Sequence, residues 1–391
     1  MPAKQRHPAS RDPSAKDPSD RTPSAKVPSA LKVNTGIEPP SSINEEAARA
    51  FRQRQRQPLT ERDYVEGILG GDRVMLSKAI TLVESSLPGH GIMAQRIIEQ
   101  CIPHSGKSLR IGITGVPGVG KSTFIEAFGK FLTGRGHKLA VLAVDPSSEI
   151  SRGSILGDKT RMEQLAVDEN AFVRPSPSAG SLGGVARKTR EIIILCEAAG
   201  FDTVLVETVG VGQSEVAVHS MVDFFLLLML AGAGDELQGI KRGIIEMCDG
   251  MAINKADGDN LNKAKLARVQ YENALHLFPP TTTGWNPRVE ICSSIEKTGI
   301  DKVWDMISEH HELLATKGLF HVKRQSQQKF RMYETINETL TTHFYQHPGV
   351  IRQLPGAELQ LSQDRLTSFQ AATKLLKAYF SDQGITPPDH L

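Results

Sequence analysis

Short apolar runs alternate with helically patterned stretches through the middle of the chain. The longest run, 224–231, is far below the roughly 20 residues that cross a bilayer, so we interpret it as a buried strand. Alternation of this kind predicts an α/β fold with a doubly wound, mostly parallel sheet. The predicted strands are 111–114, 139–144, 172–174, 203–206, 224–230, 251–253 and 289–291.

The pattern changes towards the N-terminus. Residues 1–43 are rich in Pro, Ser, Lys, Arg and Asp, and this tail is predicted to be disordered because it has too little apolar surface to bury. An organellar transit peptide is the alternative. Asp12, Asp17 and Asp20 disfavour it, since such peptides are poor in acids.

Residues 44–105 are predicted to form a small helical subdomain. Thr60 with Asp63 resembles a capping box, and Asp72 is suited to cap the following helix. Pro88-Gly89 then predicts a break before a second apolar series.

Residues 325–391 carry a purely helical pattern, with breaks predicted at 347–349 and near 355–356. Such amphipathic helices need a cover for their apolar face, either the parent domain or a second copy in a homodimer. The first apolar stripe comprises Phe330, Tyr333, Ile336, Leu340 and Phe344.

Composition and charge narrow the function classes. The net charge of the 391 residues is +2, which gives no reason to expect nucleic acid or a membrane as partner. The four cysteines lie far apart without zinc-type spacing, so we expect reduced thiols in a cytoplasmic protein, with the mitochondrial matrix as the alternative. These cysteines are Cys101, Cys196, Cys248 and Cys292.

The stretch LRIGITGVPGVGKST (109–123) has the GxxxxGK[ST] pattern between a predicted strand and a predicted helix. Its glycines permit close approach to phosphates, which the backbone N–H groups and the helix N-terminus would bind. Lys121 would reach the β- and γ-phosphates, and Ser122 is the expected Mg²⁺ ligand. The predicted nucleotide-binding loop is Gly115, Val116, Pro117, Gly118, Val119, Gly120, Lys121, Ser122 and Thr123.

Three acids follow this loop, two of them at the ends of predicted strands. Asp145 and Asp158 are candidate Mg²⁺ ligands, with helix N-caps as the alternative, and Glu207 would hold Mg²⁺ through water. After Glu207, the Gly210 N–H would bond a γ-phosphate, as in a switch loop. Gln213 is a candidate to orient the attacking water, or a plain loop residue.

Asn254-Lys255-Ala256-Asp257 follows the predicted strand 251–253 and has the NKxD pattern. The carboxylate of Asp257 would accept hydrogen bonds from N1–H and the N2 amino group of guanine, which adenine cannot offer. After the last predicted strand, residues Ser293, Ser294 and Ile295 lie where a backbone contact to guanine O6 would come from. The predicted ligands are therefore GTP or GDP with Mg²⁺.

Five longer stretches are more specific than a P-loop, and they resemble the MeaB/MMAA/ArgK family of P-loop GTPases associated with cobalamin-dependent acyl-CoA mutases. The resemblance covers roughly residues 60–380. At 151–153 the sequence SRG replaces a more glycine-rich stretch of the family. The five stretches are ILGDKTRM (155–162), RPSPSAGSLGGVARKT (174–189), VETVGVGQSE (206–215), GAGDELQGIKRGI (232–244) and NKADGDN (254–260).

The resemblance implies a GTPase domain at 106–324 and a dimerisation region at 325–391. It also implies a G-protein chaperone that gates adenosylcobalamin delivery from an adenosyltransferase to a methylmalonyl-CoA mutase-type enzyme, and protects or reactivates that mutase. Hydrolysis would be slow alone and stimulated by the mutase. By family pattern Lys121, Asp145, Asp158 and Glu207 form the phosphate and metal site, and 232–241 is a further switch loop.

Two other classes share the P-loop. A small-molecule kinase or transport-associated ATPase would leave the NKAD motif without an evident role. A metal-insertion chaperone would carry Cys/His ligand clusters, whereas the sequence offers only the adjacent pair His310-His311, predicted to be solvated on a helix.

Overall fold

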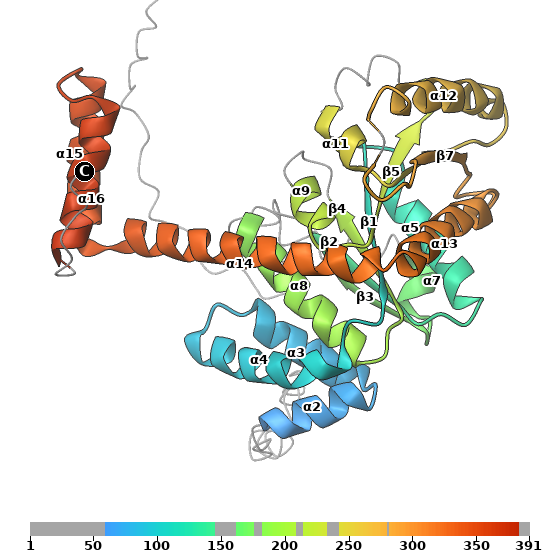
Figure 1. Ribbon diagram of the computed structural model, residues 1–391. Coiled ribbons are helices and arrows are strands. Elements are labelled where there is room, and N and C mark those ends of the chain that lie inside the picture. The colour runs from blue at the N-terminus through green and yellow to red at the C-terminus, as the bar shows by residue number, and fades with distance from the viewer. Residues whose placement is uncertain are drawn as a thin grey trace, which may run out of the picture. The chain divides into compact units, whose positions relative to one another are not determined.

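The computed structural model describes residues 59–144, 162–175, 182–208, 214–232, 242–279 and 281–382. Within them a seven-stranded parallel sheet, in the order β3-β2-β4-β1-β5-β6-β7, has helices on both faces (Figure 1). This confirms the predicted doubly wound sheet and all seven predicted strands. The strands are β1 (Leu109–Gly115), β2 (Leu139–Val144), β3 (Ala171–Pro175), β4 (Thr203–Thr208), β5 (Phe224–Leu230), β6 (Gly250–Asn254) and β7 (Arg288–Ile291).

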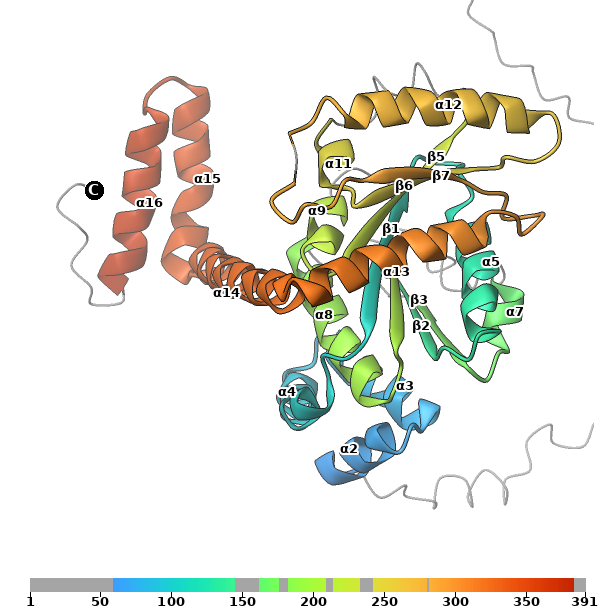
Figure 2. The ribbon, with the colours of Figure 1, turned by 45° about the vertical axis from the view of Figure 1, so that its right-hand side comes forward.

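Both faces of the sheet are buried, and its strands β2 and β5 are apolar at every position. In β5, Phe224 and Leu226 pack into one core while Phe225 and Leu227 pack into the other. The face that carries Phe224 and Leu226 is covered by three helices, which Figure 2 shows. They are α5 (Lys121–Thr133), α7 (Glu163–Ala166) and α13 (Ile300–Thr316). The opposite face is covered by α8 (Leu182–Ala198), α9 (Ser214–His219), α11 (Arg242–Met247) and α12 (Asn260–Leu275).

Three helices precede the sheet and pack against α8: α2 (Glu61–Leu69), α3 (Arg73–Glu84) and α4 (Pro88–Cys101). The capping box of Thr60 and Asp63 is confirmed, and the side chain of Asp72 accepts hydrogen bonds at the start of α3. Pro88 occupies the first turn of α4, where its missing N–H costs nothing. A short 3₁₀ turn, η1 (Ile102–His104), leads towards β1.

The C-terminal region is helical, as predicted, and consists of α14 (Leu319–Gln346), α15 (Pro348–Ser362) and α16 (Ser368–Asp382). Val350 and Ala357 of α15 pack against Ala371 of α16. The predicted break near 355–356 is wrong, because Pro355 lies inside α15 and the chain turns only after Ser362.

His310 is a second correction. It was expected to be solvated, but it is 2% exposed and its ring lies edge-on to Phe224 and Trp285. Burial lowers the pKa of His310 to about 4, although Asp249 lies 3.6 Å away and opposes that shift.

Two further findings concern thiols and membranes. Cys101, Cys196, Cys248 and Cys292 are free and buried. Across the helices of the described ranges, none has the length and apolar character needed to cross a membrane. The domain limits at 43, 105 and 324 and the cytoplasmic location stay predictions.

Candidate nucleotide site

The predicted phosphate loop joins the end of β1 to the start of α5. Gly118 and Gly120 have φ of 78° and 88°, a left-handed conformation that favours glycine. A Cβ on Gly115 would lie 2.6 Å from the backbone oxygen of Leu228, so the loop also needs glycine where it passes β5. Gly120 caps α5 without a side-chain hydrogen bond, which leaves the helix N-terminus available to an anion.

Lys121 is the first residue of α5, and its Nζ donates to the carbonyl oxygen of Gly115 at 2.9 Å. This hydrogen bond folds the side chain back over the loop. Burial lowers the pKa of Lys121, while the nearby carboxylates of Glu207 and Glu215 oppose that shift. Glu215 is buried on α9 and was not a predicted site residue, although it ends the stretch VETVGVGQSE.

A hydroxyl and a carboxylate meet beside the loop. Ser122 Oγ donates to Glu207 Oε1 at 3.4 Å, and Glu207, at the carboxyl end of β4, is only 7% exposed. Behind them Thr208 Oγ1 donates to Thr114 Oγ1 at 2.8 Å and fixes β4 to β1 at this depth. These hard oxygen donors fit a magnesium ion that also takes oxygens from phosphate and water.

Four predicted residues, Asp145, Asp158, Gly210 and Gln213, lie outside the described residues, as does the SRG stretch at 151–153. In the part of the chain that the structure describes, no group of three or more His, Cys, Asp or Glu side chains could hold a metal ion.

The NKAD segment is bonded directly to the phosphate loop. Asn254, 1% exposed at the end of β6, donates from Nδ2 to the carbonyl oxygen of Val119 at 2.9 Å. Lys255 Nζ donates to the carbonyl oxygen of Gly118 at 2.8 Å. The two side chains therefore hold residues 254–257 and the loop in one arrangement.

Asn254 also fixes the segment that follows β7. Its Oδ1 accepts from the backbone N–H of Ser294 at 3.2 Å and from Ser294 Oγ at 2.7 Å. Ser293 Oγ donates to Asp257 Oδ2 at 2.7 Å, which orients the carboxylate. The structure thus brings together Asn254, Lys255, Asp257, Ser293 and Ser294.

Ile295 is the next residue, with its side chain 76% exposed. The thiol of Cys292, 3.8 Å from Asn254 Oδ1, is a further neighbour that no motif predicted.

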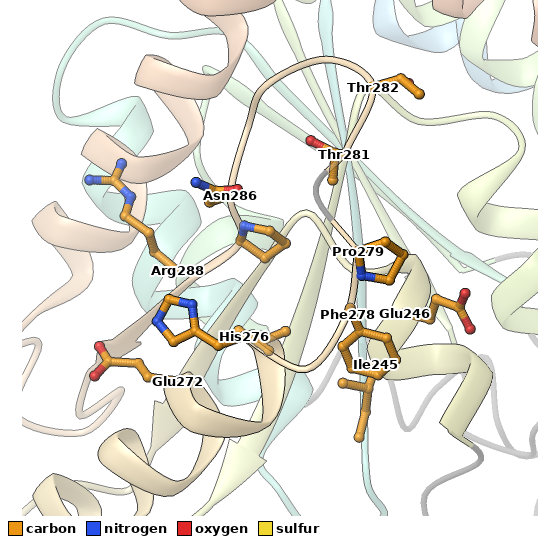
Figure 3. A pocket seen from close by; sticks show the side chains of 12 residues that line it. Ile245, Glu246, Glu272, His276, Phe278, Pro279, Thr281, Thr282, Asn286 and Arg288 are labelled. Atoms are coloured by element: carbon orange, nitrogen blue, oxygen red, sulfur yellow. The ribbon is translucent and has the colours of Figure 1, made fainter.

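A pocket of about 760 Å³ opens elsewhere, among α11, α12 and the segment before β7 (Figure 3). In this view Phe278 and Ile245 lie next to each other, and Glu272, His276 and Arg288 lie on the other side. None of the predicted nucleotide-site residues lines it. The phosphate loop, the NKAD segment and their neighbours therefore form a separate site, at the carboxyl ends of β1, β4, β6 and β7.

A strand–loop–helix phosphate site bonded to an NKxD segment on a parallel sheet defines a P-loop GTPase. Comparison with known proteins agrees, because residues 76–349 match the family model of the methylmalonyl-CoA mutase-associated GTPase MeaB. The chain belongs to the MeaB family.

Two curated relatives illustrate this similarity. The chain is 47% identical over 337 residues to the mitochondrial methylmalonic aciduria type A homolog of Mus musculus, covering 84% of this chain and 81% of that one. It is 49% identical over 275 residues to the GTPase ArgK of Escherichia coli, covering 70% and 83% respectively.

A solved structure described as a LAO/AO transport system kinase superposes with a TM-score of 0.67 at 38% identity. The superposition covers 81% of this chain and 96% of that one. The predicted fold and family are thereby confirmed.

Proposed function

We propose that this protein is a GTP-driven switch that controls a cobalamin-dependent acyl-CoA mutase of the methylmalonyl-CoA mutase type. The observation that carries the proposal is the bonding of Asn254 and Lys255 to the phosphate loop, with Asp257 oriented by Ser293. A base-reading carboxylate is thereby held in fixed relation to the triphosphate site. The family description, which names the mutase, supports the choice of partner.

In this proposal the loop from Gly115 to Thr123 binds the phosphates, and Lys121 neutralises their charge. The ion would be Mg²⁺, held by Ser122 and, directly or through water, by Asp145, Asp158 and Glu207. Bound there, it would neutralise developing charge on the β- and γ-phosphates.

Gly210 would sense the γ-phosphate, and Gln213 would orient the attacking water. Asp257 would select guanine, with Ser293, Ser294 and Ile295 beside the base. Hydrolysis would be Mg²⁺-dependent and stimulated by the mutase.

The switch would gate adenosylcobalamin delivery from an adenosyltransferase and protect or reactivate the mutase. Such a role requires that nucleotide state alters the surface offered to a partner. In the sequence, residues 209–213 directly follow β4, the strand that carries Glu207, and residues 233–241 come shortly after β5. We infer that these segments transmit the nucleotide state to the partner.

The working form would be a homodimer. None of the side chains along α14 is fully buried, and four apolar members of its predicted stripe are about half exposed. A second copy would remove this surface from water, which a single copy leaves uncovered. These four are Phe330, Tyr333, Ile336 and Leu340.

The test is GTP hydrolysis by the full chain with and without purified methylmalonyl-CoA mutase, with ATP as the competing nucleotide. Stimulation that is specific for GTP, lost in Asp257→Ala and retained in Asp259→Ala, is expected. Asp259 is a matched control because it is an exposed acid two residues away.

Equal use of ATP, or no response to any acyl-CoA mutase, would contradict the proposal. ATP-dependent phosphorylation of a small molecule would instead favour the kinase that the solved relative's description names.

A further inference from the structure

A second pocket, of about 310 Å³, lies at the amino ends of the strands, away from the phosphate loop. Its walls come from four segments: residues 102–110, α8, the α9–β5 connection and α14. Ile193, Ile194 and Met221 give it an apolar side. No Asp or Glu is among the described residues that line the pocket. Its long polar side chains are Arg110, Arg190, Arg324, Arg331, Gln327 and Gln328.

Two of the four arginines are held in bidentate ion pairs with buried carboxylates. Arg110 donates from Nε and a terminal nitrogen to both carboxylate oxygens of Glu197, at 2.8 and 2.9 Å. Arg324 does the same with Asp223, at 2.9 and 2.7 Å, and also donates to two backbone carbonyl oxygens. These pairs attach α8 and α14 to the amino ends of β1 and β5.

The other two arginines are incompletely paired. Arg190 is 7% exposed and donates to Glu334 Oε2 at 2.6 Å and to Ser220 Oγ at 2.5 Å. Its Nε is buried and has no hydrogen-bond partner in the described ranges, an arrangement that costs free energy unless a ligand accepts the bond.

Among the described residues Arg331 has one weak ion pair, with its terminal nitrogen 3.5 Å from Glu191 Oε1. Burial lowers the pKa of Arg331, and the neighbouring guanidinium groups of Arg190 and Arg187 lower it further, against the opposing effect of Glu191. A partly buried cation beside other cations is stabilised by any anion that enters the pocket.

We propose that this pocket binds a phosphate group carried on a small molecule with an apolar body. Guanidinium groups match phosphate geometry through paired N–H donors, and a dianion would serve both Arg190 and Arg331. The apolar side of Ile193, Ile194 and Met221 would pack against the rest of the ligand. The volume lies at the lower end of the range for small-molecule pockets, about 300–1,000 Å³.

Two carboxylates, Glu191 and Glu334, compete with such a ligand because each faces one of these arginines. Neither lines the pocket. Their presence gives the proposal opposite expectations for two substitutions: removing the charge of Arg331 weakens phosphate binding, and removing that of Glu191 strengthens it.

The experiment is a calorimetric titration of the full chain with phenyl phosphate and inorganic phosphate at constant ionic strength. A non-hydrolysable GTP analogue with Mg²⁺ is kept saturating, so that the phosphate loop and its γ-phosphate position are filled. Arg331→Gln should weaken phenyl phosphate binding at least about tenfold, since it loses a charge-assisted contact. Glu191→Gln should tighten binding, and Arg365→Gln, an exposed arginine after α15, should leave it unchanged.

Undetectable binding, or equal binding in Arg331→Gln and the unaltered chain, would overturn the site. Acetate binding as tightly as inorganic phosphate would overturn the phosphate assignment, and inorganic phosphate matching phenyl phosphate would overturn the apolar body. Should Arg331→Gln fail to fold, Glu191→Gln decides, because unchanged or weaker binding in that variant contradicts the proposal. GTP affinity, measured in parallel, tests the nucleotide site separately.

Discussion

Replacing Asp257 by Asn tests whether this carboxylate reads the base. An ionised carboxylate only accepts hydrogen bonds, which matches the N1–H and N2 amino donors of guanine. Ser293 Oγ donates to Asp257 Oδ2 at 2.7 Å. The amide oxygen of Asn can accept that same hydrogen bond, so the segment is expected to keep its geometry while the base contact changes.

The magnitude follows from the hydrogen bonds that change. The variant keeps one acceptor and turns the other into an NH₂ donor, which then faces a donor of guanine. Losing a hydrogen bond to a charged group costs about 1.5–3 kcal/mol, and leaving the new donor unsatisfied adds about 1–3 kcal/mol. The sum, roughly 2.5–6 kcal/mol, corresponds to a loss of GTP affinity of about 10²- to 10⁴-fold.

The assay is competition of unlabelled nucleotides against a fluorescent guanine nucleotide, with xanthosine triphosphate included. Xanthine has a carbonyl at C2 where guanine has the amino group, so the Asn amide can donate to it. Asp257→Asn should therefore bind xanthosine triphosphate more tightly than GTP, and ATP should gain nothing. Asp259→Asn is the control, since Asp259 caps α12 without a side-chain hydrogen bond.

A loss of GTP affinity below about tenfold would refute the reasoning. So would an equal loss for GTP and xanthosine triphosphate, because a disturbed fold rather than a changed base contact would then explain it.

Three further predictions concern stability and assembly. Gly112→Ala should lower the free energy of unfolding by about 1–3 kcal/mol, because its Cβ would lie 2.8 Å from Phe225 Cδ2 in the packed core. Urea titration measures this change, and an unchanged midpoint would contradict that packing. The pKa of His310 is about 4 folded against 6.5 unfolded, so the unfolded chain binds more protons between these values and stability falls as pH drops through that window. In His310→Gln the loss of unfolding free energy between pH 7 and pH 4.5, measured by urea titration, should be smaller by up to about 3 kcal/mol. An equal loss in both proteins would contradict this prediction. Ile336→Asp should convert the dimer to a monomer, measured as molar mass by light scattering, whereas Thr341→Asp, also exposed on α14, should leave the dimer intact. A molar mass unchanged in both variants would contradict the α14 interface.

The sheet could be predicted because its strands are buried on both faces. Phe224 to Leu230 are apolar at every position, a pattern that depends on the strand alone. The phosphate loop and the NKAD segment could also be located, since each is a short motif whose residue types follow from the ligand. What the sequence could not give was the bonding between them, such as the Asn254 side chain on the Val119 carbonyl, because 135 residues separate the partners.

Tertiary packing overrode local signals elsewhere. Pro355 predicts a break, since it cannot donate to the preceding turn and its ring crowds the backbone. The helix continues through it because Val350 and Ala357, on either side, are buried in the core shared with α16. His310 was likewise misjudged, since a histidine on an amphipathic helix gives no sign that aromatic rings will enclose it.

The amino ends of the strands are held by another kind of interaction, which has no sequence period. Arg324 Nε donates to Asp223 Oδ1 at 2.9 Å, and Lys323 Nζ lies 3.3 Å from Asp249 Oδ2, so adjacent residues of α14 attach it to the starts of β5 and β6. Each carboxylate is mostly buried, and removing its cation would leave an uncompensated charge. The nucleotide site, at the carboxyl ends of the strands, can be recognised in the sequence from local motifs. The attachment of α14 at the other end is visible only once the fold brings residues about 75 to 100 positions apart into contact.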